Sequence, residues 1–252
     1  MESTWHWQTM SPTRKKYFVR LLGRILILLV CVYMALSEPS AYGILEGGAF
    51  FEKPSWLHAL WIVWVIDMLL QLIPVRHRVP LGSQKLFKLR FKPIRDKINP
   101  QALKHYVVTT TRSAYRVMIL WVMLVALIGF LKFRGVLNNT GLFLISAAFY
   151  VCDLICVLIW CPFRLMMKTR CCTTCRIFNW DHLMMFTPML FVHGFYARSL
   201  LIMSIVVFIA WELSVVIHPE RFWFQSNETL QCANCTDKLC TQYCQKLRQR
   251  PS

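Results

Sequence analysis

The sequence lacks the short motifs that identify many soluble enzymes. It contains no glycine-rich phosphate-binding loop, no HExxH metalloprotease motif and no G-x-S-x-G nucleophile elbow. Internal repeats, low-complexity regions and the aromatic-plus-basic pattern of nucleic-acid modules are also absent. The chain therefore offers no recognisable catalytic motif, and we expect no nucleic-acid partner. Whether it is an enzyme stays open at this point, with a redox role as one option.

Acidic residues are scarce. The 252 residues include 12 Asp and Glu against 29 Lys and Arg, which gives a formal net charge of +17. On a soluble protein such a charge would indicate a nucleic acid or an anionic surface as partner. Here 56% of the residues are hydrophobic and they occur in long runs. Because membrane proteins collect Lys and Arg in their cytoplasmic loops, the composition favours an integral membrane protein.

Six apolar segments predict an all-α, polytopic bundle of about six transmembrane helices. About 20 helical residues cross the hydrocarbon core, and lipid offers no partner for unpaired backbone groups. The fifth segment is marginal, because its apolar part is short and holds a Thr-Pro step. Extending it from residue 177 gives enough length but places Asp181 and His182 at the interface. The predicted spans are about 18–36, 56–73, 117–133, 142–161, 177–197 and 199–217.

The basic residues predict the orientation of these spans. If the N-terminus is cytoplasmic and all six segments cross, 25 of the 29 Lys and Arg lie on the cytoplasmic side. Eleven of them lie in a long basic loop, residues 74–116. We therefore expect a transmembrane domain over 1–217 and a cytoplasmic, cysteine-rich tail over 218–252. Both termini would be inside a cytoplasmic-type membrane.

The basic loop has a pattern of its own. Its stretch LFKLRFKP alternates apolar and basic residues from Leu86 to Pro93. This alternation favours a short strand or an extended segment on the lipid headgroups, and a solvated charge run is the alternative. Further along, Asn99 and Pro100 are typical of a helix start, and that helix could continue into the third span.

The eleven cysteines fall into different classes. Cys31, Cys152 and Cys156 lie within spans and are expected to pack as small apolar residues. Cys152 and Cys156 are four residues apart on one helix face, so their thiols could also ligate a metal. Cys161, where the fourth span meets the cytoplasm, is ambiguous. The remaining seven form a CCxxC group in the loop after the fourth span and a C-x2-C-x4-C-x3-C group in the tail.

These two groups predict a cytoplasmic metal site. The cytosol keeps thiols reduced, which disfavours disulfides, and two CxxC turns can supply four thiolates to one tetrahedral ion. The favoured set would join the loop to the tail, with zinc as the preferred metal: Cys172, Cys175, Cys232 and Cys235. An iron–sulfur cluster on the tail and reactive thiols without metal stay open. Additional candidate ligands are Cys171, Cys240, Cys244 and His182.

Two sequons in the tail suggest a different topology. Asn227 in NET and Asn234 in NCT match the N-glycosylation pattern. If the fifth segment were re-entrant, the tail would lie outside and its cysteines would form disulfides. The basic residues of the tail favour the inside location instead.

Three carboxylates lie within spans and are candidate functional groups, because acids inside a membrane are costly. Asp67, Asp153 and Glu212 all fall five to eight residues before the cytoplasmic end of their segments. They could form a cation or proton site that opens to the cytoplasm. Structural ion pairing is the favoured interpretation, with Arg24, Arg112 and Arg116 as the expected partners.

Three functions follow from these patterns. The first is a membrane scaffold or accessory protein whose thiolate zinc site fixes the tail for a protein partner at the cytoplasmic face. The second is a membrane redox protein that passes electrons through an iron–sulfur cluster. The third is a cation transporter that uses the intramembrane acids. The lipid bilayer is the expected environment, and the sequence gives no oligomeric state.

Overall fold

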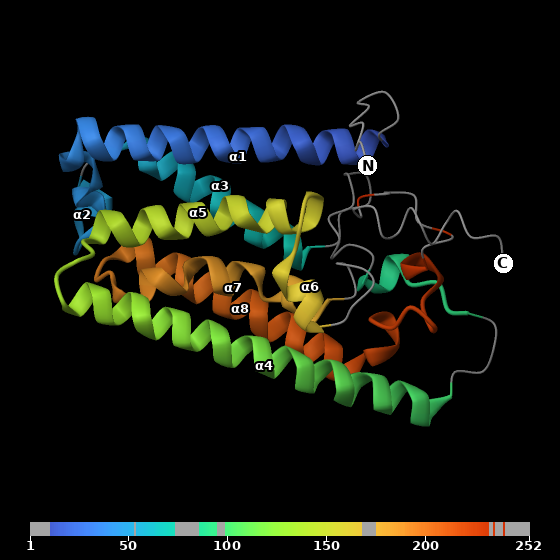
Figure 1. The fold of residues 1–252 in the computed structure, drawn as a ribbon. Helices are drawn as coiled ribbons and strands as arrows, with labels where there is room; N and C mark the ends of the chain where they lie inside the picture. Colours follow the sequence, from blue (N-terminus) through green and yellow to red (C-terminus); the bar gives the residue numbers. More distant parts are fainter. Residues whose placement is uncertain are drawn as a thin grey trace, which may run out of the picture.

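The computed structural model describes residues 11–52, 54–73, 86–94, 99–167, 175–231, 234 and 239, with the side chains of residues 164 and 165 left aside. In this part of the chain the regular structure is entirely helical, as predicted. Four helices are long and apolar enough to cross a membrane, and they lie roughly along one direction (Figure 1). They are α1 (Pro12–Ser37), α4 (Pro100–Phe133), α5 (Asn139–Leu158) and α8 (Phe195–Ile217).

A shorter apolar helix completes the first half of the bundle. α3 (Trp56–Leu72) has 17 residues and packs along α8, while α1 packs along α5. Between α1 and α3 the chain forms the 3₁₀ turn η2 (Pro39–Leu45) and the single turn α2 (Ala49–Glu52). The helix α6 (Pro162–Met167) follows α5 after a sharp bend.

The fifth predicted span is not one helix. Residues 175–194 instead form η6 (Arg176–Asn179), α7 (Asp181–Phe186) and η7 (Thr187–Phe191) in succession. Pro188 explains the break, because it has no N–H to continue the hydrogen bonds of α7. α7 packs against both α5 and α8, so this broken segment lies within the bundle. α8 then begins at Phe195, four residues before the predicted start.

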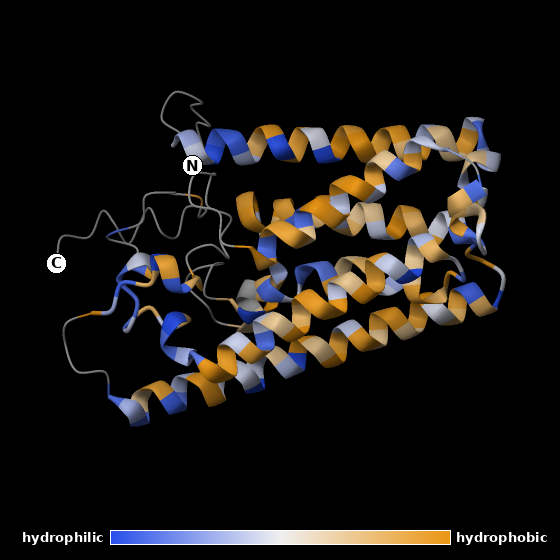
Figure 2. Ribbon diagram, turned by 180° about the vertical axis from the view of Figure 1, so that it is seen from behind, coloured by the Kyte–Doolittle hydropathy of each residue, from blue (hydrophilic) through white to orange (hydrophobic). Residues whose placement is uncertain are grey.

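The helix that was expected to begin at Asn99 does so. The Asn99 side chain accepts hydrogen bonds from the backbone N–H groups of Gln101 and Ala102, at 2.9 and 3.3 Å. α4 continues from there without interruption into the predicted third span. With 34 residues, α4 is the longest of the described helices. Its first turns extend beyond the apolar part of the bundle (Figure 2).

At one end of the bundle, the connection between α1 and α3 meets the start of α8. The Gly47 N–H donates to the His193 carbonyl at 2.9 Å, and the Phe195 N–H donates to the Gly47 carbonyl. Gly194 has no space for a side chain, since a Cβ there would lie 2.1 Å from the Leu45 carbonyl oxygen. This close backbone approach fixes the end of the broken segment against η2.

Nearby, Tyr42 in η2 is buried and donates a hydrogen bond to the Cys31 carbonyl at 2.6 Å. Burial raises the pKa of the Tyr42 phenol, so the group stays protonated and keeps its role as a donor.

At the opposite end, part of the basic loop packs against the segment after α8. Instead of a strand, the loop forms the 3₁₀ turn η4 (Lys88–Arg90), with Leu86 buried before it. The Glu228 N–H then donates to the Lys92 carbonyl at 2.9 Å, and Pro93 forms an isolated antiparallel bridge with Asn227. The basic loop and the start of the tail therefore lie at the same end of the bundle.

Asn227, the first sequon residue, is fully buried. Its amide donates to the Arg221 carbonyl at 2.9 Å and its oxygen accepts from the Thr229 hydroxyl at 2.7 Å. This asparagine serves a structural role between η8 (Pro219–Arg221) and η9 (Glu228–Leu230). It gives no support to a glycosylated, inverted tail.

The core and the outer surface are both apolar. Trp64 lies at the centre of the core, where its ring contacts Phe143, Phe186 and Tyr196 at centroid distances of 5.2 to 6.5 Å. The long helices nevertheless leave large apolar side chains on the outside, for example Leu22 at 64% and Ile119 at 62% exposed. Water does not favour such a surface, whereas the bilayer does.

Candidate functional site

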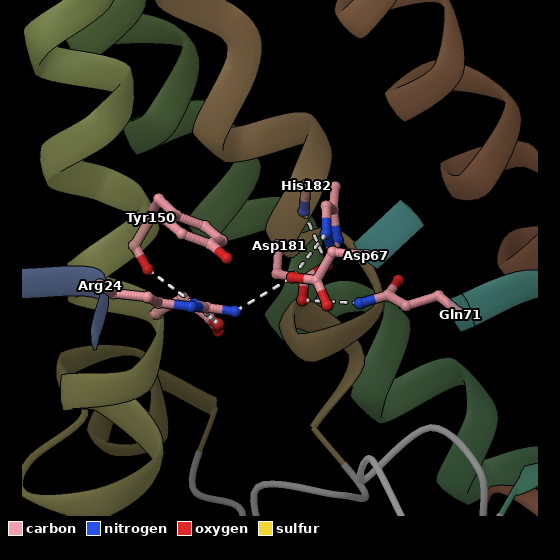
Figure 3. A network of polar contacts seen from close by, with 7 residues as sticks. Arg24, Asp67, Gln71, Tyr150, Asp181 and His182 are labelled. Atoms are coloured by element: carbon pink, nitrogen blue, oxygen red, sulfur yellow. Dashed lines mark hydrogen bonds and ion pairs between the residues drawn. The ribbon is translucent and has the colours of Figure 1, made fainter. Parts of the chain in front are cut away.

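An arginine lies at the centre of the first polar cluster. α1 carries Arg24 into the space between α3 and α5 (Figure 3). Its guanidinium donates to the Asp153 carboxylate at 2.8 Å and to the Asp67 carboxylate at 3.1 Å. It also donates to the Tyr150 carbonyl at 2.7 Å and lies 3.7 Å from the centroid of the Tyr150 ring. One cation therefore pairs with two of the three predicted intramembrane acids.

The broken segment adds a second layer to this cluster. Asp181, at the first position of α7, accepts hydrogen bonds from Gln71 at 2.9 Å and from the His182 ring nitrogen Nδ1 at 2.9 Å. The other ring nitrogen of His182, Nε2, lies 3.8 Å from the Asp67 carboxylate. His182 thus connects Asp181 to Asp67 and is buried within the protein, with 3% of its surface exposed.

The third acid belongs to a separate cluster. Both carboxylate oxygens of Glu212 accept from the guanidinium of Arg176, one of them at 3.0 Å. The indole N–H of Trp180 donates to Glu212 at 2.7 Å, and Arg176 also donates to the Thr111 hydroxyl on α4 at 2.6 Å. This bidentate pair ties η6 to α4 and α8, since its residues come from all three.

The partners of the acids were predicted in part. Arg24 pairs with Asp67 and Asp153 as expected, whereas Arg112 and Arg116 are exposed on α4. Arg176 replaces them as the partner of Glu212. Sequence reasoning missed it because Arg176 was counted as a charge of the cytoplasmic loop, and the packing of η6 against α4 and α8 was not anticipated. The only signal in the sequence was the position of Glu212 inside its predicted span, where a carboxylate needs a cationic partner.

A cavity lined by sulfur-bearing side chains lies beside the first cluster. Its volume is about 220 Å³, and its walls come from α4, α5, α6 and the broken segment. Cys152, Cys156, Cys161 and Cys175 all line it, together with Met184 and Met185. Asp153 and Asp181 form part of the same wall, so the cavity and the ion-pair cluster share two residues.

The predicted metal ligands are described only in part. Cys175 is buried at 6% exposure, next to η6. Cys171, Cys172, Cys232, Cys235, Cys240 and Cys244 lie outside the described residues. Within the described ranges, no group of three or more Cys, His, Asp or Glu residues is arranged to hold a metal ion. The His182 ring lies against the carboxylates of Asp181 and Asp67, at 2.9 and 3.8 Å.

One described residue of the tail, Leu239, contacts the end of the bundle. Leu239, which directly precedes Cys240, packs against an apolar cluster formed by the facing ends of α1 and α5, together with Phe178 of η6. This contact brings a part of the tail to the end of the bundle where Cys175 lies.

Comparisons with known proteins supply no relative. No family model, no curated protein and no solved structure matches this chain. Its function therefore has to be argued from the arrangement of its own residues.

Proposed function

We propose that this chain is a six-pass integral membrane protein that acts as a scaffold or accessory protein, with a structural zinc site at its cytoplasmic face. The observation that carries the proposal is the pairing of the intramembrane acids. Asp67 and Asp153 bind Arg24, and Glu212 binds Arg176. These charges tie α1, α3, α5, α8 and the broken segment together, which suits a fixed structure.

Six passages require that α3 and the broken segment also cross. A 17-residue helix is about 25 Å long at 1.5 Å per residue, close to the thickness of the hydrocarbon core. The broken segment extends from Asp181, which bonds to Gln71 near the end of α3, to Gly194, which meets Gly47 at the other end. Most of its residues are buried within protein, the condition under which irregular backbone is tolerated at membrane depth.

The basic residues supply the orientation. The end that carries the basic loop and the start of the tail would face the cytoplasm, because 25 of the 29 Lys and Arg belong to it. Both termini would then be inside. The thiols after α5 and in the tail would share this reducing compartment, where cysteine pairs hold metals more readily than they form disulfides.

The ion pairs argue against cation transport. A cation that entered between Asp67 and Asp153 would have to displace the Arg24 guanidinium, which already donates to both carboxylates. Glu212 is held by two donors from Arg176 and one from Trp180. Transport through these acids would therefore require breaking the contacts that stabilise the bundle.

The zinc site rests on ligand chemistry. Four thiolates suit a tetrahedral zinc with bond lengths of about 2.3 Å, and Cys172, Cys175, Cys232 and Cys235 supply that number. The contact of Leu239 with the apolar cluster that includes Phe178 supports a tail that folds back to Cys175. Zinc would staple the tail to the loop after α5 and present a fixed surface to a protein partner.

Metal analysis of protein purified without oxygen tests this proposal. We expect a colourless preparation with about one zinc per chain, lost in the Cys172→Ser and Cys232→Ser variants. Cys31→Ser is the matched control, because Cys31 is buried within α1 and its variant should retain zinc. A brown, iron-containing preparation would contradict the zinc scaffold and support the iron–sulfur redox protein. Folded protein without metal would contradict both proposals.

A further inference from the structure

The end of α5 brings two thiols together. Cys156 lies in the last turn of the helix, and the chain then turns back, with the N–H groups of Ile159 and Trp160 both donating to the Ile155 carbonyl. Cys156 and Cys161 both line the same cavity, and they lie close enough for their thiols to interact. A pair of thiols in this contact is placed for oxidation to a disulfide by a small local movement.

The cavity beside this pair suits a flat apolar ring. Trp121, Phe149 and Phe163 contribute aromatic faces to its wall. Its volume of about 220 Å³ exceeds that of a cavity of about 150 Å³ known to bind benzene in another protein. A six-membered ring with small substituents therefore fits, and Cys156 and Cys161 both line the space that it would occupy.

The surroundings indicate which class of oxidant could reach the thiols. A hydrophilic oxidant such as a glutathione disulfide would lose the hydration of several charges on entering an apolar wall. Asp153 and Asp181, the acids of that wall, are already bonded to Arg24 and to Gln71 and His182. An uncharged electron acceptor that is dissolved in the bilayer has no hydrated charges to lose when it enters the cavity.

We propose that this cavity binds the ring of a membrane quinone and that Cys156 and Cys161 reduce it. The two S–H bonds break and one S–S bond forms. The two electrons pass to the quinone ring, and the two thiol protons end on its two oxygens, which gives the hydroquinone and a Cys156–Cys161 disulfide. The reaction itself needs no metal, although Cys175, one of the proposed zinc ligands, lines the same cavity.

The test uses the full chain, reduced, freed of reductant and reconstituted in lipid nanodiscs without oxygen. The probe is decylubiquinone, whose ring carbons are all substituted, so that a thiol does not add to the ring. Quinone reduction is followed by its ultraviolet absorbance, and the disulfide is mapped by mass spectrometry in the unmodified chain. Cys156→Ser and Cys161→Ser are the test variants. Cys31→Ser is the control, because Cys31 is buried in α1 and does not line the cavity.

We expect about one hydroquinone per chain and a disulfide between Cys156 and Cys161. The initial rate should fall at least about tenfold in each test variant and stay within about twofold in Cys31→Ser. Folded wild-type protein that leaves the quinone oxidised would overturn the proposal, whatever the variants do. So would a disulfide mapped to other cysteines, or a rate that survives in both test variants.

Discussion

Removal of Arg24 is the most informative single change in the bundle. Arg24→Met keeps an apolar stem of similar length and deletes the cation. Asp67 and Asp153 then lose their shared partner in a region where their side chains are 23% and 15% exposed. The Tyr150 carbonyl also loses its donor, and the Tyr150 ring loses the overlying guanidinium.

The expected cost follows from the physics of buried charge. Breaking a buried ion pair by removing one partner costs about 3–5 kcal/mol, because an uncompensated charge stays behind. Arg24 serves two carboxylates, but one or both can take up a proton, so we expect the change to remain within this range. Since about 1.4 kcal/mol is a tenfold change in an equilibrium constant, the unfolded fraction should rise at least about a hundredfold.

Unfolding in mixed micelles of a mild detergent and sodium dodecyl sulfate measures this effect. Arg20→Met is the control, since Arg20 is exposed on the same helix one turn earlier. The variant that combines Arg24→Met with Asp67→Asn and Asp153→Asn should recover most of the lost stability, because all three charges are then removed together. A loss below about 1 kcal/mol for Arg24→Met, equal to that of the control, would refute the structural role of the cluster.

The remaining predictions concern backbone packing and the tail. Gly194→Ala should destabilise the bundle by about 1–3 kcal/mol, because its Cβ would overlap the Leu45 carbonyl. Gly48→Ala should be neutral in the same unfolding assay, because Gly48 has open space around it. Asn227→Ala should loosen the docked segment by about 1–3 kcal/mol, seen as faster limited proteolysis after residue 218, while the exposed Asn234→Ala should not. Equal effects within either pair of variants would contradict the contacts described here.

Much of the architecture could be predicted because the lengths of the apolar runs can be read directly from the sequence. The helices around Leu26, Leu127, Ile145 and Ile205 lie in continuous apolar runs, and lipid leaves such runs no other regular form. The start of α4 was equally readable, since Asn99 and Pro100 are chemically suited to a helix N-terminus. The fifth segment was not, because a Thr-Pro step breaks a helix without stating what replaces it.

The sequence showed which buried acids need a cationic partner. It did not show which cation pairs with each acid. Acids inside a membrane require partners, and depth made Arg24 one of three candidate cations. The structure shows that Arg24 pairs with Asp67 and Asp153. The pairing of Glu212 with Arg176 depends on how η6 folds back beside α8, which is a tertiary property. The contact between Cys156 and Cys161 likewise depends on the turn after α5, which residue spacing does not specify.

Labelling from outside intact cells tests the central claim most directly, that the chain crosses six times with its basic, cysteine-rich end in the cytoplasm. A membrane-impermeant biotin maleimide would be applied to Gly48→Cys, His193→Cys and Glu228→Cys, with the modified residue identified by mass spectrometry. The account predicts labelling at residues 48 and 193, and labelling at residue 228 only after the cells are opened. Labelling of residue 228 in intact cells, or protection of residue 193 when residue 48 reacts, would contradict it.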